Sequence, residues 1–156
     1  MPDQLQPGDQ APPFSLHDQS GNEVTLAGYA GRRVLVYFYP KADTPGCTAQ
    51  ACGLRDVLGS IGATAVVGIS PDPPKRQAAF DAKYGLGFPL LADTAHEVAE
   101  AYGVWAQKSM YGRSYMGIER SAFLVGADGR LEKAWYKVSP ADTVKNLLAA
   151  VGDATS

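Results

Sequence analysis

Apolar runs of strand length alternate along the chain with stretches in which apolar residues recur every three or four positions. The runs predict strands, and the recurrences predict amphipathic helices. The expected strands cover residues 14–17, 23–26, 33–39, 63–69, 88–92, 121–125 and 131–137. The expected helices cover about 45–60, 74–84, 94–102 and 140–151. Strands that alternate with helices, followed by a hairpin and a last helix, indicate an α/β fold with a mixed central sheet flanked by helices.

Turn residues separate these segments and leave two parts of the chain without a regular element. Asp18–Asn22 and Gly126–Arg130 each place a Gly between two strands, which favours a β-hairpin. Residues 1–13 are rich in Pro, Gln and Asp and are expected to form an arm over the surface. Residues 103–117 interleave Gly with Trp, Met and Tyr, so we expect an irregular loop that either lines a ligand site or docks on the core. No repeat or linker divides the chain, which predicts a single domain over residues 1–156.

Composition narrows the classes of function. The chain has 156 residues, of which 46% are hydrophobic and 19% charged, and this suits one globular domain with a substantial core. A net charge of −2 argues against nucleic acid or an anionic membrane as the main partner. No apolar run reaches the length of a membrane span, and the polar first residues do not resemble a signal peptide, so we expect a cytoplasmic protein. In a reducing cytoplasm the two cysteines are expected to be catalytic or sensing and not structural.

Both cysteines lie in one segment, Tyr39–Asp56, in which a buried strand leads into a helix. Thr44 is a favourable N-cap, and Pro45 falls at the first helical position, where its missing N–H is not needed. Cys47 then lies in the first helical turn, close to unpaired N–H groups and to the positive end of the helix dipole. Such a position stabilises a thiolate. The sequence therefore predicts a reactive sulfur at Cys47.

The two cysteines are expected on different sides of this helix. Cys47 shares a stripe with Ala51 and Leu54 and should face the core, whereas Cys52 lies on the more polar side. On an ideal helix their Cα atoms are roughly 8–9 Å apart. A disulfide needs a separation below about 7 Å. The two thiols can therefore form a bond only if the first turns of the helix unwind.

Structural, metal-binding and thiol–disulfide exchange roles are the alternatives for the two cysteines. Free cysteines often only fill space in a core, and this applies more to Cys52 than to Cys47. A zinc site is not expected, because His17 and His96 show no paired ligand spacing and read as surface residues. The C-x-x-C motif of thiol–disulfide oxidoreductases is absent, since the spacing here is C-x-x-x-x-C.

The segment Tyr37–Asp56, with the sequence YFYPKADTPGCTAQACGLRD, closely resembles the active-site segment of peroxiredoxins of the bacterioferritin-comigratory-protein (peroxiredoxin Q) type. The similarity covers nearly the whole chain and continues through Phe88–Asp93, Tyr102–Trp105, Met110–Gly112 and Gly117–Leu124. The resemblance implies a thioredoxin-like fold, thiol peroxidase activity and thioredoxin as the usual reductant. It implies no metal and no cofactor.

The resemblance also implies roles for single residues. Cys47 would be the peroxidatic cysteine, which attacks the peroxide and becomes a sulfenic acid. Cys52 would be the resolving cysteine, which closes an intramolecular disulfide after local unfolding. Thr44 would orient the peroxide and the thiolate, a role that competes with helix capping. Arg120 would hold the thiolate and stabilise the leaving oxygen, although an exposed arginine at a strand end is the favoured interpretation from the residue alone.

The remaining members of this expected site are less specific. Pro40 would shield the pocket from water, although an ordinary turn proline explains it equally well. Backbone N–H groups of Gly46 and Cys47 could bind the substrate oxygens. Two positions depart from the family pattern, because Gln50 stands where Glu is frequent and Ala122 where Thr is frequent. These departures concern the tuning of the pocket and not the reaction.

The leading hypothesis is a thioredoxin-dependent peroxidase for hydrogen peroxide and small organic hydroperoxides. We expect a monomer, with a dimer through residues 103–117 as the other possibility. The alternative function is a peroxide-sensing redox switch that acts through a partner protein once the disulfide forms. Steady-state turnover with thioredoxin would separate the two. A thiol–disulfide oxidoreductase is the third hypothesis, and insulin reduction would test it.

Overall fold

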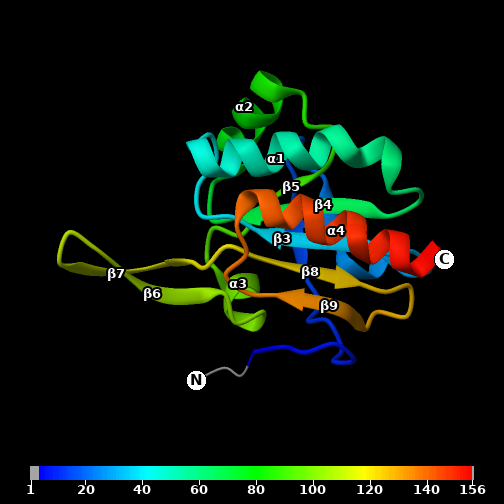
Figure 1. The fold of residues 1–156 in the computed structure, drawn as a ribbon. Helices are drawn as coiled ribbons and strands as arrows, with labels where there is room; N and C mark the ends of the chain where they lie inside the picture. Colours follow the sequence, from blue (N-terminus) through cyan, green and yellow to red (C-terminus); the bar gives the residue numbers. More distant parts are fainter. Residues whose placement is uncertain (1–3, 156) are drawn as a thin grey trace.

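A seven-stranded sheet with the strand order β2-β1-β5-β4-β3-β8-β9 forms the centre of the protein (Figure 1). The computed structural model describes residues 4–155, with side chains described through residue 152. The strands are β1 (Ser15–His17), β2 (Glu23–Thr25), β3 (Val34–Phe38), β4 (Ala65–Ser70), β5 (Leu90–Ala92), β6 (Trp105–Met110), β7 (Arg113–Ile118), β8 (Ser121–Val125) and β9 (Leu131–Trp135). The helices are α1 (Pro45–Val57), α2 (Pro74–Tyr84), α3 (Glu97–Ala101) and α4 (Pro140–Thr155), with 3₁₀ turns η1 (Leu26–Tyr29) and η2 (Leu58–Ser60).

The sheet is mixed, as expected from the sequence. Strand β4 pairs in parallel with β3 and with β5, whereas β3 with β8, β8 with β9, and β1 with both β2 and β5 are antiparallel. Helices α1, α2 and α4 cover one face, and α3 covers the other (Figure 1). The predicted α/β class with a central mixed sheet flanked by helices is therefore confirmed.

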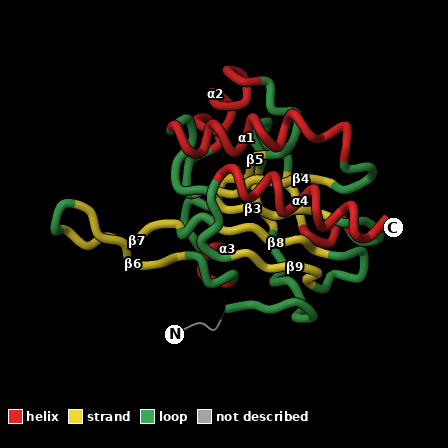
Figure 2. The backbone as a smooth tube through the Cα atoms, viewed as in Figure 1, coloured by secondary structure: helices red, strands yellow, loops and turns green. Residues whose placement is uncertain are grey.

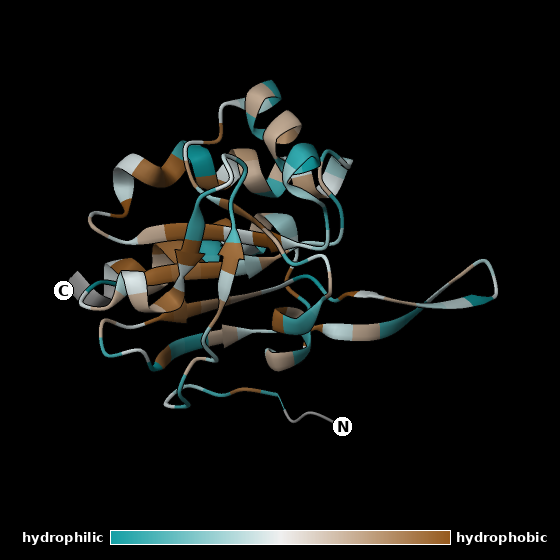
Figure 3. Ribbon diagram, turned by 180° about the vertical axis from the view of Figure 1, so that it is seen from behind, coloured by the Kyte–Doolittle hydropathy of each residue, from teal (hydrophilic) through white to brown (hydrophobic). Residues whose placement is uncertain are grey.

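Each face of the sheet has its own apolar core, and the central strand β3 contributes to both. All five residues of β3 are buried. Leu35 and Tyr37 point to the face covered by α1, α2 and α4, and Val36 and Phe38 point to the opposite face. This two-sided burial explains why the segment reads as a continuous apolar run without alternation. Figure 3 shows hydrophobic residues concentrated in the strands of the central sheet.

The expectation of an irregular loop over residues 103–117 is wrong. Residues 105–118 instead form an antiparallel two-stranded ribbon, β6 with β7, that protrudes from the body on the side where α1 begins (Figures 1 and 2). Tyr111 and Gly112 form the turn, both with positive φ. The ribbon was missed because neither face is buried along most of its length, so no period-2 alternation of apolar residues marks it.

One further expectation needs adjustment. The third helix is shorter than expected, because α3 covers only Glu97–Ala101 and His96 adopts a left-handed backbone in front of it. The Asp93 carboxylate nevertheless accepts the N–H groups of Val98 and Ala99 at 3.3 and 2.9 Å, so this acidic residue does cap the helix. Among residues 4–155, no helix combines the length and apolarity that crossing a bilayer requires.

Candidate active site

The candidate site lies where α1 begins, at the carboxyl end of β3. Thr44 has an extended backbone (φ −93°, ψ 157°) and Pro45 is the first helical residue, which confirms the predicted start of the helix. The predicted capping hydrogen bond is wrong, because the Thr44 side chain does not cap α1. Its hydroxyl donates instead to the Lys41 carbonyl at 2.8 Å. Asp43 between them has φ 61°, and this left-handed turn brings the carbonyl within reach of the hydroxyl.

The first turn of α1 keeps backbone donors available. The Thr48 N–H donates to the Thr44 carbonyl at 2.8 Å, which is the first i→i−4 bond that a helix beginning at Pro45 can form. The N–H groups of Gly46 and Cys47 precede that bond. Because no side chain caps the helix, they remain at the positive end of its dipole. This is the arrangement in which helix starts bind anions.

Cys47 is almost completely buried, and Arg120 reaches it from another part of the chain. Its side chain is 1% exposed and belongs to the core under α1. The Arg120 Nη2 atom lies 3.4 Å from the Cys47 Sγ atom. Arg120 directly precedes β8, and β8 pairs antiparallel with β3 so that Ser121 lies opposite Phe38. This pairing brings a residue 73 positions away in sequence to the start of α1.

Arg120 is half-buried and directs its charge toward the sulfur. Its Nη1 atom donates to the Gln50 side-chain carbonyl at 2.6 Å, and its own carbonyl accepts the Val138 N–H at 2.9 Å. Within the described residues it forms no ion pair with a carboxylate. A guanidinium whose neighbours are an amide and a sulfur is not neutralised locally, so it can stabilise a thiolate. The interpretation of Arg120 as an exposed strand-end arginine is wrong.

Gly46 allows the guanidinium to lie this close to the helix. A Cβ atom at this position would lie 3.1 Å from Arg120 Nη2, which is tighter than most contacts of real Cβ atoms. A side chain here would push the end of the Arg120 side chain aside by a few tenths of an ångström.

Gln50 extends the contacts of Arg120 to α4. Gln50 is fully buried, and its Nε2 atom donates to the Thr143 hydroxyl at 2.9 Å. That hydroxyl donates in turn to the Ser139 carbonyl at 2.8 Å. From the sequence, Gln50 stood out only as a departure from a family pattern, and Thr143 did not stand out. The spacing could have placed Gln50 near the site, since residues i and i+3 lie on the same side of a helix.

The structure does not bring every expected residue into contact with Cys47. Pro40 is half-buried and follows the fully buried Tyr39 at the end of β3, beside the loop that leads to Thr44. In the described part of the chain, the side-chain hydrogen bond of Cys47 is the one to Arg120, and Thr44 is bonded to Lys41 instead. Thr44 and Pro40 therefore lie in the loop between β3 and α1, and neither forms a hydrogen bond to the sulfur.

Cys52 lies in the same intact helix as Cys47, and both cysteines are free. It is half-buried and packs against the core face that contains Cys47. The neighbouring Gly53 faces α4, where an added Cβ atom would lie 2.9 Å from Val144 Cγ2. The second turn of α1 is thus held by apolar packing, so separating it from α4 requires that packing to open.

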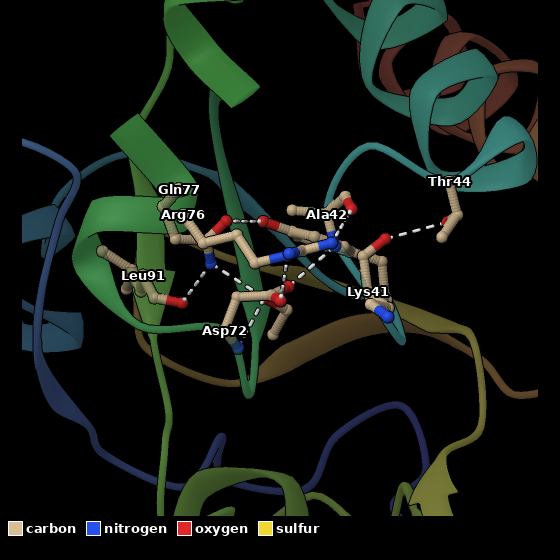
Figure 4. Close-up of polar contacts among 9 residues, drawn as sticks. Lys41, Ala42, Thr44, Asp72, Arg76, Gln77 and Leu91 are labelled. Atoms are coloured by element: carbon tan, nitrogen blue, oxygen red, sulfur yellow. Dashed lines mark hydrogen bonds and ion pairs between the residues drawn. The ribbon is translucent and has the colours of Figure 1, made fainter. Parts of the chain in front are cut away.

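A buried polar network lies behind the loop that carries Thr44 (Figure 4). The Tyr39 hydroxyl donates to the side-chain oxygen Oε1 of Gln77 at 2.5 Å, and Gln77 Nε2 donates to the Ser70 hydroxyl at 2.8 Å. The Ser70 hydroxyl donates to Asp72 at 2.7 Å. Burial raises the pKa of Tyr39, so its hydroxyl stays protonated and acts as a donor near neutral pH. No expectation from the sequence included this network, although Ser70 and Asp72, which follow the predicted strand over residues 63–69, are a signal for it.

No group of His, Cys, Asp and Glu within residues 4–155 is arranged to hold a metal ion. His17 is exposed, and the half-buried His96 stacks on Trp105 at the base of the ribbon with ring centroids 4.0 Å apart. Neither histidine contacts the candidate site.

Comparison with known proteins places this arrangement in a family. Residues 7–134 match the model of the AhpC/TSA family. The chain is 52% identical to peroxiredoxin Bcp of Escherichia coli over 130 residues, which cover 82% of this chain and 83% of the relative. It is 51% identical to a putative peroxiredoxin of Mycobacterium tuberculosis over 145 residues, which cover 92% of both.

A solved structure agrees with these relatives. The bacterioferritin comigratory protein of Xanthomonas campestris, described for its alkyl peroxide reduction activity, matches with a TM-score of 0.87 and 32% identity over 100% of both chains. The matches cover most of each protein, and they agree with the thioredoxin-like fold that the resemblance implied. The chain therefore belongs to the AhpC/TSA family and is a peroxidase of the peroxiredoxin type, similar to the bacterioferritin comigratory proteins.

Proposed function

We propose that the chain reduces hydrogen peroxide and small organic hydroperoxides with Cys47 as the attacking residue. The observation that carries this proposal is the 3.4 Å approach of the Arg120 guanidinium to a buried sulfur at the start of a helix. A cation and a helix N-terminus both favour a thiolate, which is the nucleophilic form of cysteine. The alkyl peroxide reduction activity of the Xanthomonas relative supports organic hydroperoxides as substrates.

In the first step the Cys47 thiolate attacks the terminal oxygen of ROOH. A sulfur–oxygen bond forms and the oxygen–oxygen bond breaks. The leaving oxygen takes up a proton from solvent, equal to the one that the Cys47 thiol released on ionisation, to give ROH, and Cys47 becomes a sulfenic acid. Arg120 and the N–H groups of Gly46 and Cys47 stabilise the negative charge that develops on the leaving oxygen.

Thr44 and Pro40 prepare the substrate for this step. The Thr44 hydroxyl donates its hydrogen to the Lys41 carbonyl, so its lone pairs are available to accept the hydroperoxide proton. This bond would align the terminal oxygen with the sulfur. Pro40 offers no N–H and would shield the sulfur from water at the mouth of the site.

In the second step Cys52 resolves the sulfenic acid. The Cys52 thiol attacks the Cys47 sulfur, a disulfide forms, and one water molecule leaves. Both residues lie in the intact α1, so the first turns of the helix must unwind before the two sulfurs can bond. A dithiol reductant such as thioredoxin then donates two electrons and two protons, which restores both thiols and leaves the reductant as a disulfide.

Peroxide consumption coupled to thioredoxin and its reductase tests this proposal. We expect steady turnover by the wild-type chain and a Cys47–Cys52 link in peptide maps of peroxide-treated protein. Cys47→Ser should be inert with any reductant, and consumption of peroxide by this variant at the wild-type rate would refute the role of Cys47. Oxidation of wild-type Cys47 with negligible turnover would instead favour a peroxide sensor that acts through a partner protein.

A further inference from the structure

One buried carboxylate faces the backbone of the loop that carries Thr44. The Asp72 Oδ2 atom accepts the Ala42 N–H at 2.7 Å and the Ser70 hydroxyl at 2.7 Å. Its Oδ1 atom pairs with Arg76 Nε at 3.1 Å. The Asp72 side chain is 8% exposed and that of Arg76 46%, so the bonds to Ala42 and Ser70 are on the protected side. Figure 4 shows Asp72 between the loop at Ala42 and the helix that carries Arg76 and Gln77.

The carboxylate is itself held in place. Ser70, which bonds to it, also accepts a hydrogen bond from Gln77 Nε2, and Gln77 Nε2 donates to the Leu91 carbonyl at 3.0 Å. Ser70 and Gln77 are fully buried. Because buried polar groups in a satisfied network have few alternative arrangements, the network fixes the position of Asp72 relative to the sheet.

The loop beyond Ala42 needs an external support. Asp43 has φ 61°, a conformation that costs energy for a residue other than glycine. Its carboxylate bonds to Lys83 Nζ at 3.1 Å and to the Tyr84 hydroxyl at 3.0 Å, and these bonds lower its pKa. Both contacts are exposed, and exposed ion pairs contribute little. Asp72 is therefore the buried support of the residues that precede Thr44 and Cys47.

We propose that Asp72 is a positioning residue for the peroxidase reaction, which fixes the loop in front of Thr44 and Cys47 through the Ala42 N–H. This inference rests on the proposed function. Without the carboxylate the buried Ala42 N–H has no acceptor, and the loop can leave its position in front of the first turn of α1. The first turn of α1 is then less firmly anchored, so it unwinds more readily toward Cys52. Loss of Asp72 therefore slows oxidation of Cys47 and speeds its resolution.

The test compares two buried aspartates that both accept backbone N–H groups. Asp72→Ala removes the support of the loop. Asp93→Ala is the matched control, because Asp93 is 3% exposed and accepts the N–H groups of Val98 and Ala99 on the opposite face of the sheet. Asp72→Asn keeps an oxygen that can accept the Ala42 N–H. In Asp72→Ser the shorter side chain retains a polar group but does not reach the Ala42 N–H. This variant replaces Asp72→Ala if the latter does not fold.

Two kinetic measurements separate positioning from general stability. The rate of Cys47 oxidation is followed under excess hydrogen peroxide by alkylation and mass spectrometry. The second quantity is the sulfinic fraction, which is the fraction of Cys47 converted to sulfinic acid per turnover. It reports how often a second peroxide reacts with Cys47 before Cys52 does. Thermal unfolding of each variant identifies temperatures at which all are folded.

For Asp72→Ala we expect oxidation of Cys47 to slow roughly tenfold, as misplacement of a reacting group does, while the sulfinic fraction falls. Asp72→Asn should stay close to wild type in both, and Asp93→Ala should lose thermal stability with both unchanged. Equal oxidation rates for Asp72→Ala and Asp93→Ala, or a sulfinic fraction that rises in Asp72→Ala, would overturn the inference. A wild-type chain that does not react with peroxide would refute the proposed function, and this inference with it.

Discussion

The first and second turns of α1 hold one cysteine each, and they are held in place by different forces. Around Cys47 polar contacts add to the core packing, since Arg120 approaches the sulfur and Gln50 connects Arg120 to α4. Around Cys52 the contacts are apolar, because its neighbour Gly53 packs directly against Val144 of α4. The polar contacts depend on distance and charge, whereas the apolar packing opposes separation of the helices. This difference predicts that some substitutions at the first turn change the proposed oxidation step, and others at the second turn change the helix packing that the proposed resolution step must open.

The largest expected effect separates the two cysteines by function. Cys52→Ser should abolish thioredoxin-supported turnover, because no thiol remains to close the intramolecular disulfide. Oxidation of Cys47 should keep its wild-type rate, and the sulfenic acid should accumulate and react further to the sulfinic form. Labelling of sulfenic acid followed by mass spectrometry measures this. A Cys52→Ser protein that turns over normally with thioredoxin would contradict the proposed resolving role.

Removal of the Arg120 cation should slow the reaction of Cys47 in the first turn of α1 and leave the packing of the second turn unchanged. Arg120→Met is expected to slow Cys47 oxidation by roughly 10²–10³-fold, the usual loss when one preorganised electrostatic donor is removed. Arg130→Met is the matched control, because Arg130 bonds to the Gly8 carbonyl in an exposed contact away from the site. The rate of alkylation by iodoacetamide should fall in Arg120→Met as well. Similar oxidation rates for the two variants would show that Arg120 does not act on the sulfur.

The link from Arg120 to α4 gives a smaller effect. Gln50→Leu leaves Arg120 without its amide acceptor, and we expect oxidation to slow about tenfold because the guanidinium is less precisely placed. Thr143→Val removes only the outer bond to Gln50 and should change the rate less. Stopped-flow oxidation of both variants tests the order. Slower oxidation of Cys47 in Thr143→Val than in Gln50→Leu would contradict the proposed link from Arg120 to α4.

The smallest effect concerns the packing of the second turn. Gly53→Ala should lower the free energy of unfolding by about 1 kcal/mol, since the new methyl group meets Val144 Cγ2 at 2.9 Å and overpacking outweighs the gain in helix propensity. In a Val144→Ala background the same substitution should stabilise the protein by up to about 1 kcal/mol, because only the propensity gain remains. Chemical denaturation of the four proteins measures both values. A destabilisation of equal size in both backgrounds would exclude the contact as its cause.

Part of this site could be predicted from local sequence. The start of α1 at Pro45 follows from Thr44 and Pro45, and the buried side of Cys47 follows from its spacing to Ala51 and Leu54. These features depend on a few consecutive residues, so local rules are sufficient. The predicted capping bond of Thr44 is wrong because local rules did not foresee the left-handed backbone of Asp43. That turn brings the Lys41 carbonyl within reach, and the Thr44 hydroxyl donates to it instead.

Other parts could not be read from single residues. The ribbon β6–β7 lies largely outside the core, so its strands carry no alternation that would mark them. Neither Asp72 nor Gln77 was singled out from the sequence. Their role became visible only when both were found buried beside the loop at Ala42.

The sequence by itself determined the order of strands and helices outside the β6–β7 ribbon, the mixed α/β class and the position of Cys47 in the first turn of a helix. Each of these depends on apolar periodicity and on caps within a short stretch of chain. Only the tertiary structure decided which distant groups meet the sulfur. Pairing of β8 with β3 brings Arg120 to Cys47, and the end of β4 brings Asp72 to Ala42. Contacts between residues far apart in the chain arise from strand register and burial, and no local pattern encodes them.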